Sequence, residues 1–376
     1  MDEGRLLERL VRQYSPSGSE GPAVREFAAL ASGLGYRTTI DAAGNGIAEL
    51  GRGHPELLFL GHIDTVEGER PVRWARDRLH GRGVVDAKGA LAAALLAGPE
   101  SHRSGTLRIV AAVGEETDSR GARHLLRGHP PDAVIAGEPS GWDGVTVGYK
   151  GDLRLTADFA RTRRHYSSPF PTAGDEAVAW AAAVHGWART RAKESLYRSV
   201  TAKVIALETG SPGDAESARV TVDVRLPPGL SAAEALSTLP KEPGPPRLRV
   251  SVRIDPCEPG PQNPVALALL SAIRAEGARP TIWRKAGTSD LNLALSAWSI
   301  PGAAYGPGDA RLDHTARESL SRGELRRATG VLRRAIASLT DGSTGSATPR
   351  APAADPARTP PTGARAPPRE ARRGGS

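Results

Sequence analysis

Short apolar runs alternate with segments of helical periodicity in the first part of the chain, and this alternation constrains the fold most. The runs at 56–60, 107–113 and 133–136 have the length and composition of buried strands. Residues 89–97 and 119–126, which lie between them, are predicted to be helices. The order strand, helix, strand, helix, strand is typical of an α/β fold, a mostly parallel sheet with helices on both faces.

The pattern changes in the middle of the chain. Residues 145–159 alternate apolar and polar side chains with period two, which predicts an antiparallel strand with one buried face. Further predicted elements are helices at 175–191 and 232–239 and strands at 201–208, 218–226 and 247–254. We therefore expect an α+β lid or dimerisation domain, residues 148–257, inserted into a catalytic domain made of residues 1–147 and 258–340.

The last segment, residues 341–376, contains no Leu, Ile, Val or aromatic residue. It cannot bury enough apolar surface to offset the entropy of ordering, so a disordered tail is expected. Its six arginines against three acidic residues supply part of the formal charge of +8. The remaining positive charge is spread without a dense basic run, and aromatic residues make up only 4% of the chain. Few aromatic side chains are available to stack on bases, and no nucleic-acid partner is expected.

Three absences restrict the chemistry further. No apolar stretch approaches the roughly 18 residues of a membrane span, so no membrane partner is expected. Residues 1–5 lack the basic start and apolar run of a signal peptide, which favours a cytoplasmic location. Cys257 is the single cysteine, so an internal disulfide and a thiolate cluster are excluded. Any metal ion must be held by imidazole and carboxylate groups.

Charged side chains follow the predicted strands, where ligands bind in such sheets. His62 and Asp64 follow the first strand two positions apart, so they share one face of an extended chain. By itself, a histidine in such a pair is more often a satisfied residue of the core or surface than a ligand. Asp86 lies where the next helix begins, and there an aspartate also serves as an N-cap.

Glu115 and Glu116 follow the second predicted strand, and Glu138 follows the third. An isolated glutamate pair is more typical of a solvated turn. Several carboxylates converging on one edge of a sheet, however, repel each other unless a cation offsets their charge. The set as a whole therefore predicts a metal site with His62 as a nitrogen ligand.

A late histidine, His314, completes a recognisable order of motifs. They are His-x-Asp at 62–64, Gly-x-x-Asp-x-Lys-Gly at 83–89, Gly-Glu-Glu at 114–116 and Gly-Glu-Pro at 137–139. In this order the chain, over about residues 3–339, resembles the dinuclear zinc peptidases of the M20 family, which includes acetylornithine deacetylase and succinyl-diaminopimelate desuccinylase. The resemblance implies a hydrolase of linear amides, of carboxypeptidase or deacylase type, with two divalent ions. Zinc is expected, with cobalt as the alternative.

The resemblance also assigns the ligands. Asp86 would bridge the two ions. His62 and Glu138 would complete one site, and Glu116 and His314 the other.

Further roles follow from the same resemblance. Glu115 would be the general base that takes a proton from the attacking water. Asp64 would orient His62 through its second ring nitrogen. The peptide bond between Asp86 and Ala87 would be cis.

Residues 164–168 (Arg-His-Tyr-Ser-Ser) resemble the family's His-Ser element. Its histidine, here His165, reaches the substrate carbonyl, often from the partner subunit of a dimer formed through the lid. Arg164 stands where the family has a glycine. The alternative for His165 is an ordinary exposed histidine in a basic loop.

Three stretches resemble one branch of the family more closely, at 137–151, 285–290 and 305–309. They look like the hydrolases that release lysine or ornithine from the acidic amino-group carrier protein LysW. The carrier holds the amino acid as an amide on the side chain of its C-terminal glutamate. The reaction is the last step of lysine biosynthesis through α-aminoadipate, and with ornithine it serves arginine biosynthesis.

A leaving amino acid with a free carboxylate and a cationic side chain requires both a cation and a carboxylate in the pocket. Lys150, Arg225 and Asp290 are the candidates for binding it. Two alternatives stay open at this point. One is deacylation of a free small molecule such as acetylornithine, and the other is a non-catalytic carrier-binding protein.

Overall fold

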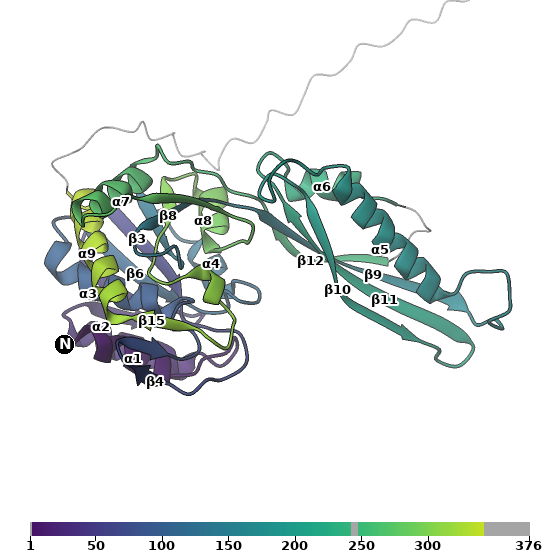
Figure 1. Ribbon diagram of the computed structural model, residues 1–376, viewed down its shortest axis with the longest axis horizontal. Helices are drawn as coiled ribbons and strands as arrows, with labels where there is room; N and C mark the ends of the chain where they lie inside the picture. Colours follow the sequence, from purple (N-terminus) through teal and green to yellow (C-terminus); the bar gives the residue numbers. More distant parts are fainter. Residues whose placement is uncertain (1, 242–246, 342–376) are drawn as a thin grey trace, which may run out of the picture. The chain divides into compact units, whose positions relative to one another are not determined.

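The computed structural model describes residues 2–241 and 247–341, and its largest element is an eight-stranded sheet (Figure 1). In spatial order the strands are β1 (Arg37–Ile40), β2 (Gly46–Gly51), β6 (Thr106–Ala112), β3 (Glu56–His62), β7 (Ala133–Gly137), β14 (Gly302–Ala304), β8 (Gly144–Tyr149) and β13 (Thr281–Lys285). β3 runs parallel to both β6 and β7, β14 to β7, and β13 to β8. The remaining pairings, β1 with β2, β2 with β6 and β14 with β8, are antiparallel. The predicted mostly parallel α/β sheet is confirmed.

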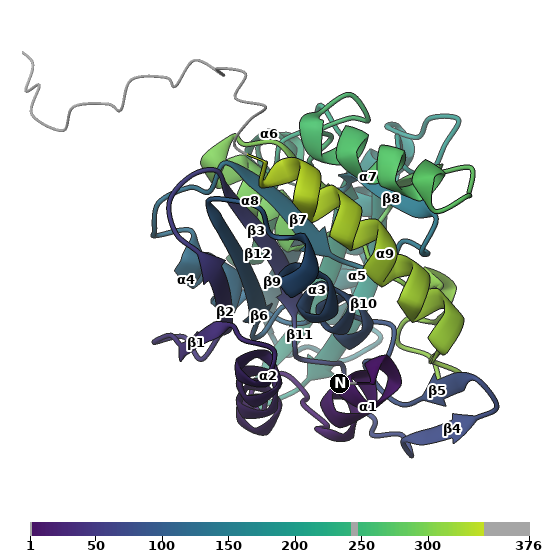
Figure 2. The same cartoon turned by 90° about the vertical axis from the view of Figure 1, so that its left-hand side faces the viewer.

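Helices cover both faces of this sheet because its strands present apolar side chains on both. Leu57 and Phe59 of β3 lie in one core, and Leu58 and Leu60 lie in the other. The first core includes α1 (Glu3–Arg12), α2 (Gly21–Gly33), α3 (Lys88–Ser101), α7 (Pro264–Ala275) and α9 (Arg322–Leu339). The second core includes α4 (Arg120–Leu125) and α8 (Asp290–Trp298). Figure 2 shows α3 and α9 in front of the sheet.

The single strand predicted at 145–159 is wrong, because the chain changes sheets within it. β8 ends at Tyr149 and is buried on both faces, whereas β9 (Gly151–Thr162) belongs to another sheet. Tyr149 exchanges backbone hydrogen bonds with Cys257, at 2.9 and 3.1 Å, where the chain returns. The apolar alternation continues through this junction, so periodicity cannot reveal it.

The inserted segment forms a four-stranded antiparallel sheet with two helices. The strand order is β10 (Thr201–Gly210), β11 (Ala215–Leu226), β9 and β12 (Arg247–Ile254), with helices α5 (Ala173–Arg189) and α6 (Ala232–Thr238). Leu153 and Leu155 of β9 pack with Trp180 of α5 in one core. We propose that this unit is the lid. The predicted bounds 148–257 also take in Gly148 and Tyr149, which belong to β8 of the large sheet.

A three-stranded sheet connects segments far apart in the sequence. It pairs β15 (Ser319–Ser321) with β5 (Arg78–His80), which pairs in turn with β4 (Arg73–Ala75). A 3-10 helix, η1 (Ala310–Leu312), precedes β15 in the chain. Among the described helices none is long and apolar enough to cross a membrane. Of the predicted tail, residues 342–376 lie outside the described part of the chain.

Candidate dinuclear metal centre

The predicted metal ligands converge at one edge of the large sheet. His62 ends β3, and Glu116 and Glu138 follow β6 and β7, the two strands parallel to it. Asp86 directly precedes the segment that enters α3, and His314 follows η1. Parallel strands bring their carboxyl ends to the same edge, which is why residues so far apart in sequence meet here.

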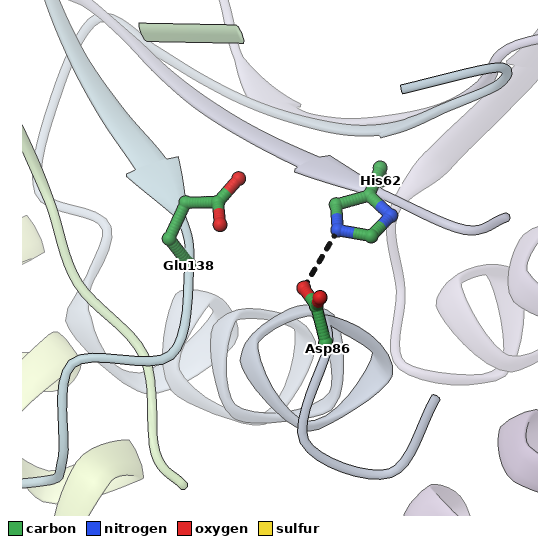
Figure 3. Close-up of side chains that lie close together, drawn as sticks. All are labelled: His62, Asp86 and Glu138. Carbon is green, nitrogen blue, oxygen red and sulfur yellow. Dashed lines mark hydrogen bonds and ion pairs between the residues drawn. The ribbon is translucent and has the colours of Figure 1, made fainter. Parts of the chain in front are cut away.

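Two groups of three side chains share Asp86. The first group is His62, Asp86 and Glu138 (Figure 3), and the second is Asp86, Glu116 and His314. Within each group one ligand atom from every residue lies within 4.8 Å of the others. Asp86 Oδ1 is 3.0 Å from His62 Nε2, and Asp86 Oδ2 is 3.1 Å from His314 Nε2. His314 Nε2 is also 3.0 Å from Glu116 Oε1. The Asp86 carboxylate thus contacts both groups, each through a different oxygen.

The ionisation of this cluster shows that it carries excess negative charge for its degree of burial. Burial, reinforced by the Asp86 carboxylate, raises the pKa of Glu138 to about 8. The same two causes raise the pKa of Asp313 to about 8. Hydrogen bonds to Asp86 and Glu116 raise the pKa of His314 to about 10. A divalent cation in each group offsets this crowding, so the residues fit two ions with nitrogen and oxygen ligands.

Asp64 organises the residues around the centre through backbone and imidazole contacts. Its Oδ1 accepts the Glu115 backbone N–H at 3.1 Å, and its Oδ2 accepts that of Glu116 at 3.1 Å. Ser17 Oγ donates to Oδ2 at 2.7 Å. His62 Nδ1 lies 3.0 Å from the Asp64 backbone oxygen and 3.6 Å from Oδ1. Asp64 therefore lies on the side of His62 that faces away from Asp86.

Glu115 is placed differently from its neighbour Glu116. Burial raises the pKa of Glu115 well above its usual range, and the nearby carboxylates of Glu138 and Asp290 act in the same direction. Glu115 lines a cavity of about 1070 Å³ together with Glu116 and His314. A carboxyl group with a raised pKa beside the ligand cluster suits a group that accepts and returns a proton near neutral pH. The peptide bond between Asp86 and Ala87 is cis, as predicted.

The comparisons with known proteins agree with this geometry. Residues 58–338 match the model of peptidase family M20/M25/M40. The chain belongs to this family.

Relatives cover nearly the whole chain. A protein of Deinococcus radiodurans described as [LysW]-lysine hydrolase is 36% identical over 90% of this chain and 97% of its own length. A putative [LysW]-lysine/[LysW]-ornithine hydrolase of Aeropyrum pernix is 36% identical over 88% of this chain and 94% of its own. Among solved structures, an M20 metallo-carboxypeptidase of Sulfolobus solfataricus has a TM-score of 0.70 at 16% identity, covering 90% of this chain and 99% of that one. This M20 protein is thus a metal-dependent amide hydrolase.

The cavity beside the centre of this M20 hydrolase is rich in arginine. Its lining includes Arg120, Arg123, Arg127, Arg154, Arg225 and Arg253. Arg120 is paired with Glu20, and Arg154 and Arg225 are paired with Asp152 and Asp223. Arg123, Arg127 and Arg253 form no ion pair with any described residue. Arg123 donates from Nε to the backbone oxygen of Asp118 at 2.9 Å, and its charge also acts on Asp290. All three arginines add positive charge to the cavity for an anionic ligand.

The structure separates the three residues predicted to bind substrate. Arg225 lines the cavity and donates to Thr288 Oγ1 at 2.8 Å. Asp290 is buried beside the centre, where burial raises its pKa to about 6. Lys150 is fully buried, and its Nζ donates to the backbone oxygens of Ser199 at 2.6 Å and Leu196 at 3.2 Å. The structure does not bring Lys150 to the cavity.

His165 is not brought to the centre of its own chain. It is exposed in the lid, with Nδ1 2.7 Å from Ser167 Oγ, and it lines a separate cavity of about 400 Å³. Within its own chain, therefore, the geometry gives His165 no role at the centre.

Sequence reasoning missed Glu318 and Arg82. Glu318 Oε1 accepts the backbone N–H of Asp86 at 3.2 Å, and Oε2 pairs with Arg82 Nη1 at 3.1 Å. The available signal was weak, an acidic residue four positions after His314 and an arginine four positions before Asp86. Neither spacing specifies a contact between loops.

Proposed function

We propose that this chain hydrolyses the amide that holds lysine or ornithine on the C-terminal glutamate of the carrier protein LysW. One observation of the structure carries the chemistry: two ligand groups share Asp86 beside a cavity that Glu115 lines. The identity of the substrate is supported by the relatives at 36% identity, since their names specify LysW-bound lysine or ornithine. The reaction is then the last step of lysine or arginine biosynthesis.

In this proposal the residues divide the work of amide hydrolysis. His62, Asp86 and Glu138 would hold one divalent ion, and Asp86, Glu116 and His314 would hold the other, with zinc or cobalt as the ions. Two such ions polarise the scissile carbonyl and lower the pKa of water when they are bound.

Glu115 accepts a proton from the attacking water and passes it to the leaving amino group. This transfer requires the carboxylate to reach the cavity, and Glu115 is among the residues that line it. Asp64 fixes the backbone of Glu115 and Glu116 through two hydrogen bonds of 3.1 Å, so the base and the adjacent ligand keep a constant separation.

The carrier-bound substrate separates this function from its alternatives. Assayed side by side, LysW-lysine and LysW-ornithine should be hydrolysed with a kcat/KM at least about 100-fold above that of acetylornithine, because carrier contacts remote from the amide contribute binding energy. A preference for acetylornithine would instead establish the small-molecule deacylase. If the purified protein held no metal and hydrolysed none of the three substrates, the non-catalytic carrier-binding protein would be the remaining alternative.

Ionic strength tests how the cavity attracts the carrier. KM for LysW-lysine should rise with salt, since surface charges are screened within about 10 Å at 0.1 M. Arg123→Gln should raise KM and flatten that dependence. Arg274→Gln is the matched control, because Arg274 is an exposed arginine on α7, which packs on the other face of the sheet. Equal behaviour of the two variants would remove the cavity arginines from carrier recognition.

We also propose a homodimer through the lid, in which His165 serves the partner's centre. β10 lies at the edge of the lid sheet and exposes Val204, Ile205 and Leu207 by 42%, 51% and 47%. An unpaired edge with apolar side chains is a surface that a second strand covers.

Subunit mixing tests this arrangement. His165→Ala and Glu115→Gln homodimers should each be nearly inactive, whereas their random mixture should recover about a quarter of the wild-type activity, since half of the dimers gain one complete site. No recovery in a mixture shown by mass spectrometry to contain heterodimers would place His165 outside the partner's centre.

A further inference from the structure

A buried ion pair lies beneath the loop that carries Asp86. Arg82 and Glu318 are 5% and 3% exposed, and Arg82 Nη1 is 3.1 Å from Glu318 Oε2. Burying such a pair is costly unless its remaining donors and acceptors are also satisfied. Here the remaining groups bind backbone, and apart from Gly68 that backbone belongs to the loops that carry Asp86 and His314.

Glu318 holds the Asp86 side of the centre. Its Oε1 accepts two consecutive backbone N–H groups, that of Val85 at 3.0 Å and that of Asp86 at 3.2 Å. These bonds fix the main chain at the residue whose two carboxylate oxygens face His62 and His314.

Arg82 holds the His314 side. Its Nη1 donates to the backbone oxygen of Thr315, the next residue after His314, at 3.3 Å, and its Nε donates to that of Gly68 at 3.2 Å. His314 has a φ of 61°, a left-handed conformation that a non-glycine residue keeps only when its surroundings enforce it. The same guanidinium therefore contacts the backbone next to that residue and the carboxylate under Asp86.

We infer that Arg82 and Glu318 are positioning residues that set the separation of Asp86 and His314 and thereby the affinity of the second ion group. The inference rests on the proposed ligand set. The competing view is that Glu318 only anchors β15, which begins at the next residue and pairs with β5. An anchor would affect the stability of the fold, whereas a positioning pair affects metal affinity specifically.

Metal titration of the chelator-stripped full-length protein separates the two views. Zinc competition with a chromophoric chelator gives both dissociation constants of the wild type and of Glu318→Gln. In the variant, we expect the larger of the two zinc dissociation constants to be about 10- to 100-fold above that of the wild type. This is the usual effect of losing a hydrogen bond that orients a metal ligand. kcat at limiting zinc should fall and recover at saturating zinc, with KM unchanged.

Glu176→Gln is the matched control. Glu176 is a buried glutamate of the lid that pairs with Arg161 and contacts none of the proposed ligands. It should lose thermal stability without any change in zinc affinity. Arg82→Lys keeps the positive charge and hence the fold, and it should weaken the same zinc site by a smaller factor.

Unchanged zinc constants in Arg82→Lys and Glu318→Gln, or an equal weakening in Glu176→Gln, would overturn the inference. A wild type that binds fewer than two zinc ions would instead overturn the proposed ligand set, so the two failures are distinguishable.

Discussion

Glu115→Gln should lower kcat by about 10²- to 10⁴-fold, the range that a positioned general acid–base group contributes, while both metal ions stay bound. The change removes the ability to accept a proton and preserves the size of the side chain. Glu115 belongs to neither ligand group, and the contact that places it is its backbone N–H to Asp64, which glutamine retains. KM for LysW-lysine should change little.

Metal content and activity must be measured on the same preparation. If Glu115→Gln holds two zinc ions per chain but has lost activity, Glu115 is the proton acceptor. Loss of metal in the variant would show that Glu115 is a ligand. Glu116→Gln is the comparison, because Glu116 lies in the second ligand group and its replacement should cost one ion as well as activity.

The convergence of the ligands was predictable because it follows from parallel pairing. Once the runs ending near His62, Glu116 and Glu138 were interpreted as neighbouring parallel strands, their carboxyl ends had to meet. The motif order then implied that Asp86 and His314 join them. In the structure Asp86 lies within hydrogen-bonding distance of both His62 and His314. What the strand pattern could not supply is which oxygen faces which imidazole.

Lys150 shows the limit of reasoning from charge. Lys150 was a candidate for binding the substrate because the pocket requires a cation, but its Nζ is buried against the backbone oxygens of Leu196 and Ser199. Those oxygens belong to the loop after α5, which the chain brings to the junction of the two sheets. Local sequence cannot specify such a partner, because hydrogen bonds to backbone leave no residue pattern on the accepting side. Burial also lowers the pKa of Lys150 to about 8, which weakens its case as a fixed cation.

The pairing of Arg82 with Glu318 was hidden for a related reason. Their separation in sequence exceeds any local spacing rule, and both are charged residues that usually lie at the surface. The strand pairing of β15 with β5 brings their loops together. Contacts of this kind depend on the completed fold, whereas ligands at strand ends depend only on the sheet.

Asp86→Asn should abolish binding of both metal ions, and this sets it apart from every other ligand variant. Asp86 alone belongs to both groups, and each of its oxygens faces a different imidazole. Asparagine keeps the shape but carries no charge, and its amide nitrogen is a donor that cannot bind a cation. Loss of both ions removes several kcal/mol of transition-state stabilisation, so kcat/KM should fall by about 10³-fold or more.

The comparison with single-site variants makes this prediction specific. Zinc content measured after gel filtration should be near zero for Asp86→Asn and near one per chain for Glu116→Gln, against two for the wild type. The pKa of His314, which hydrogen bonds to Asp86 and Glu116 raise to about 10 in the metal-free protein, should drop in Asp86→Asn toward its ordinary value, and NMR titration follows it. One ion retained by Asp86→Asn with an unchanged His314 pKa would mean that the two groups do not share this carboxylate. The centre would then consist of two independent sites, and Glu115 would serve only one of them.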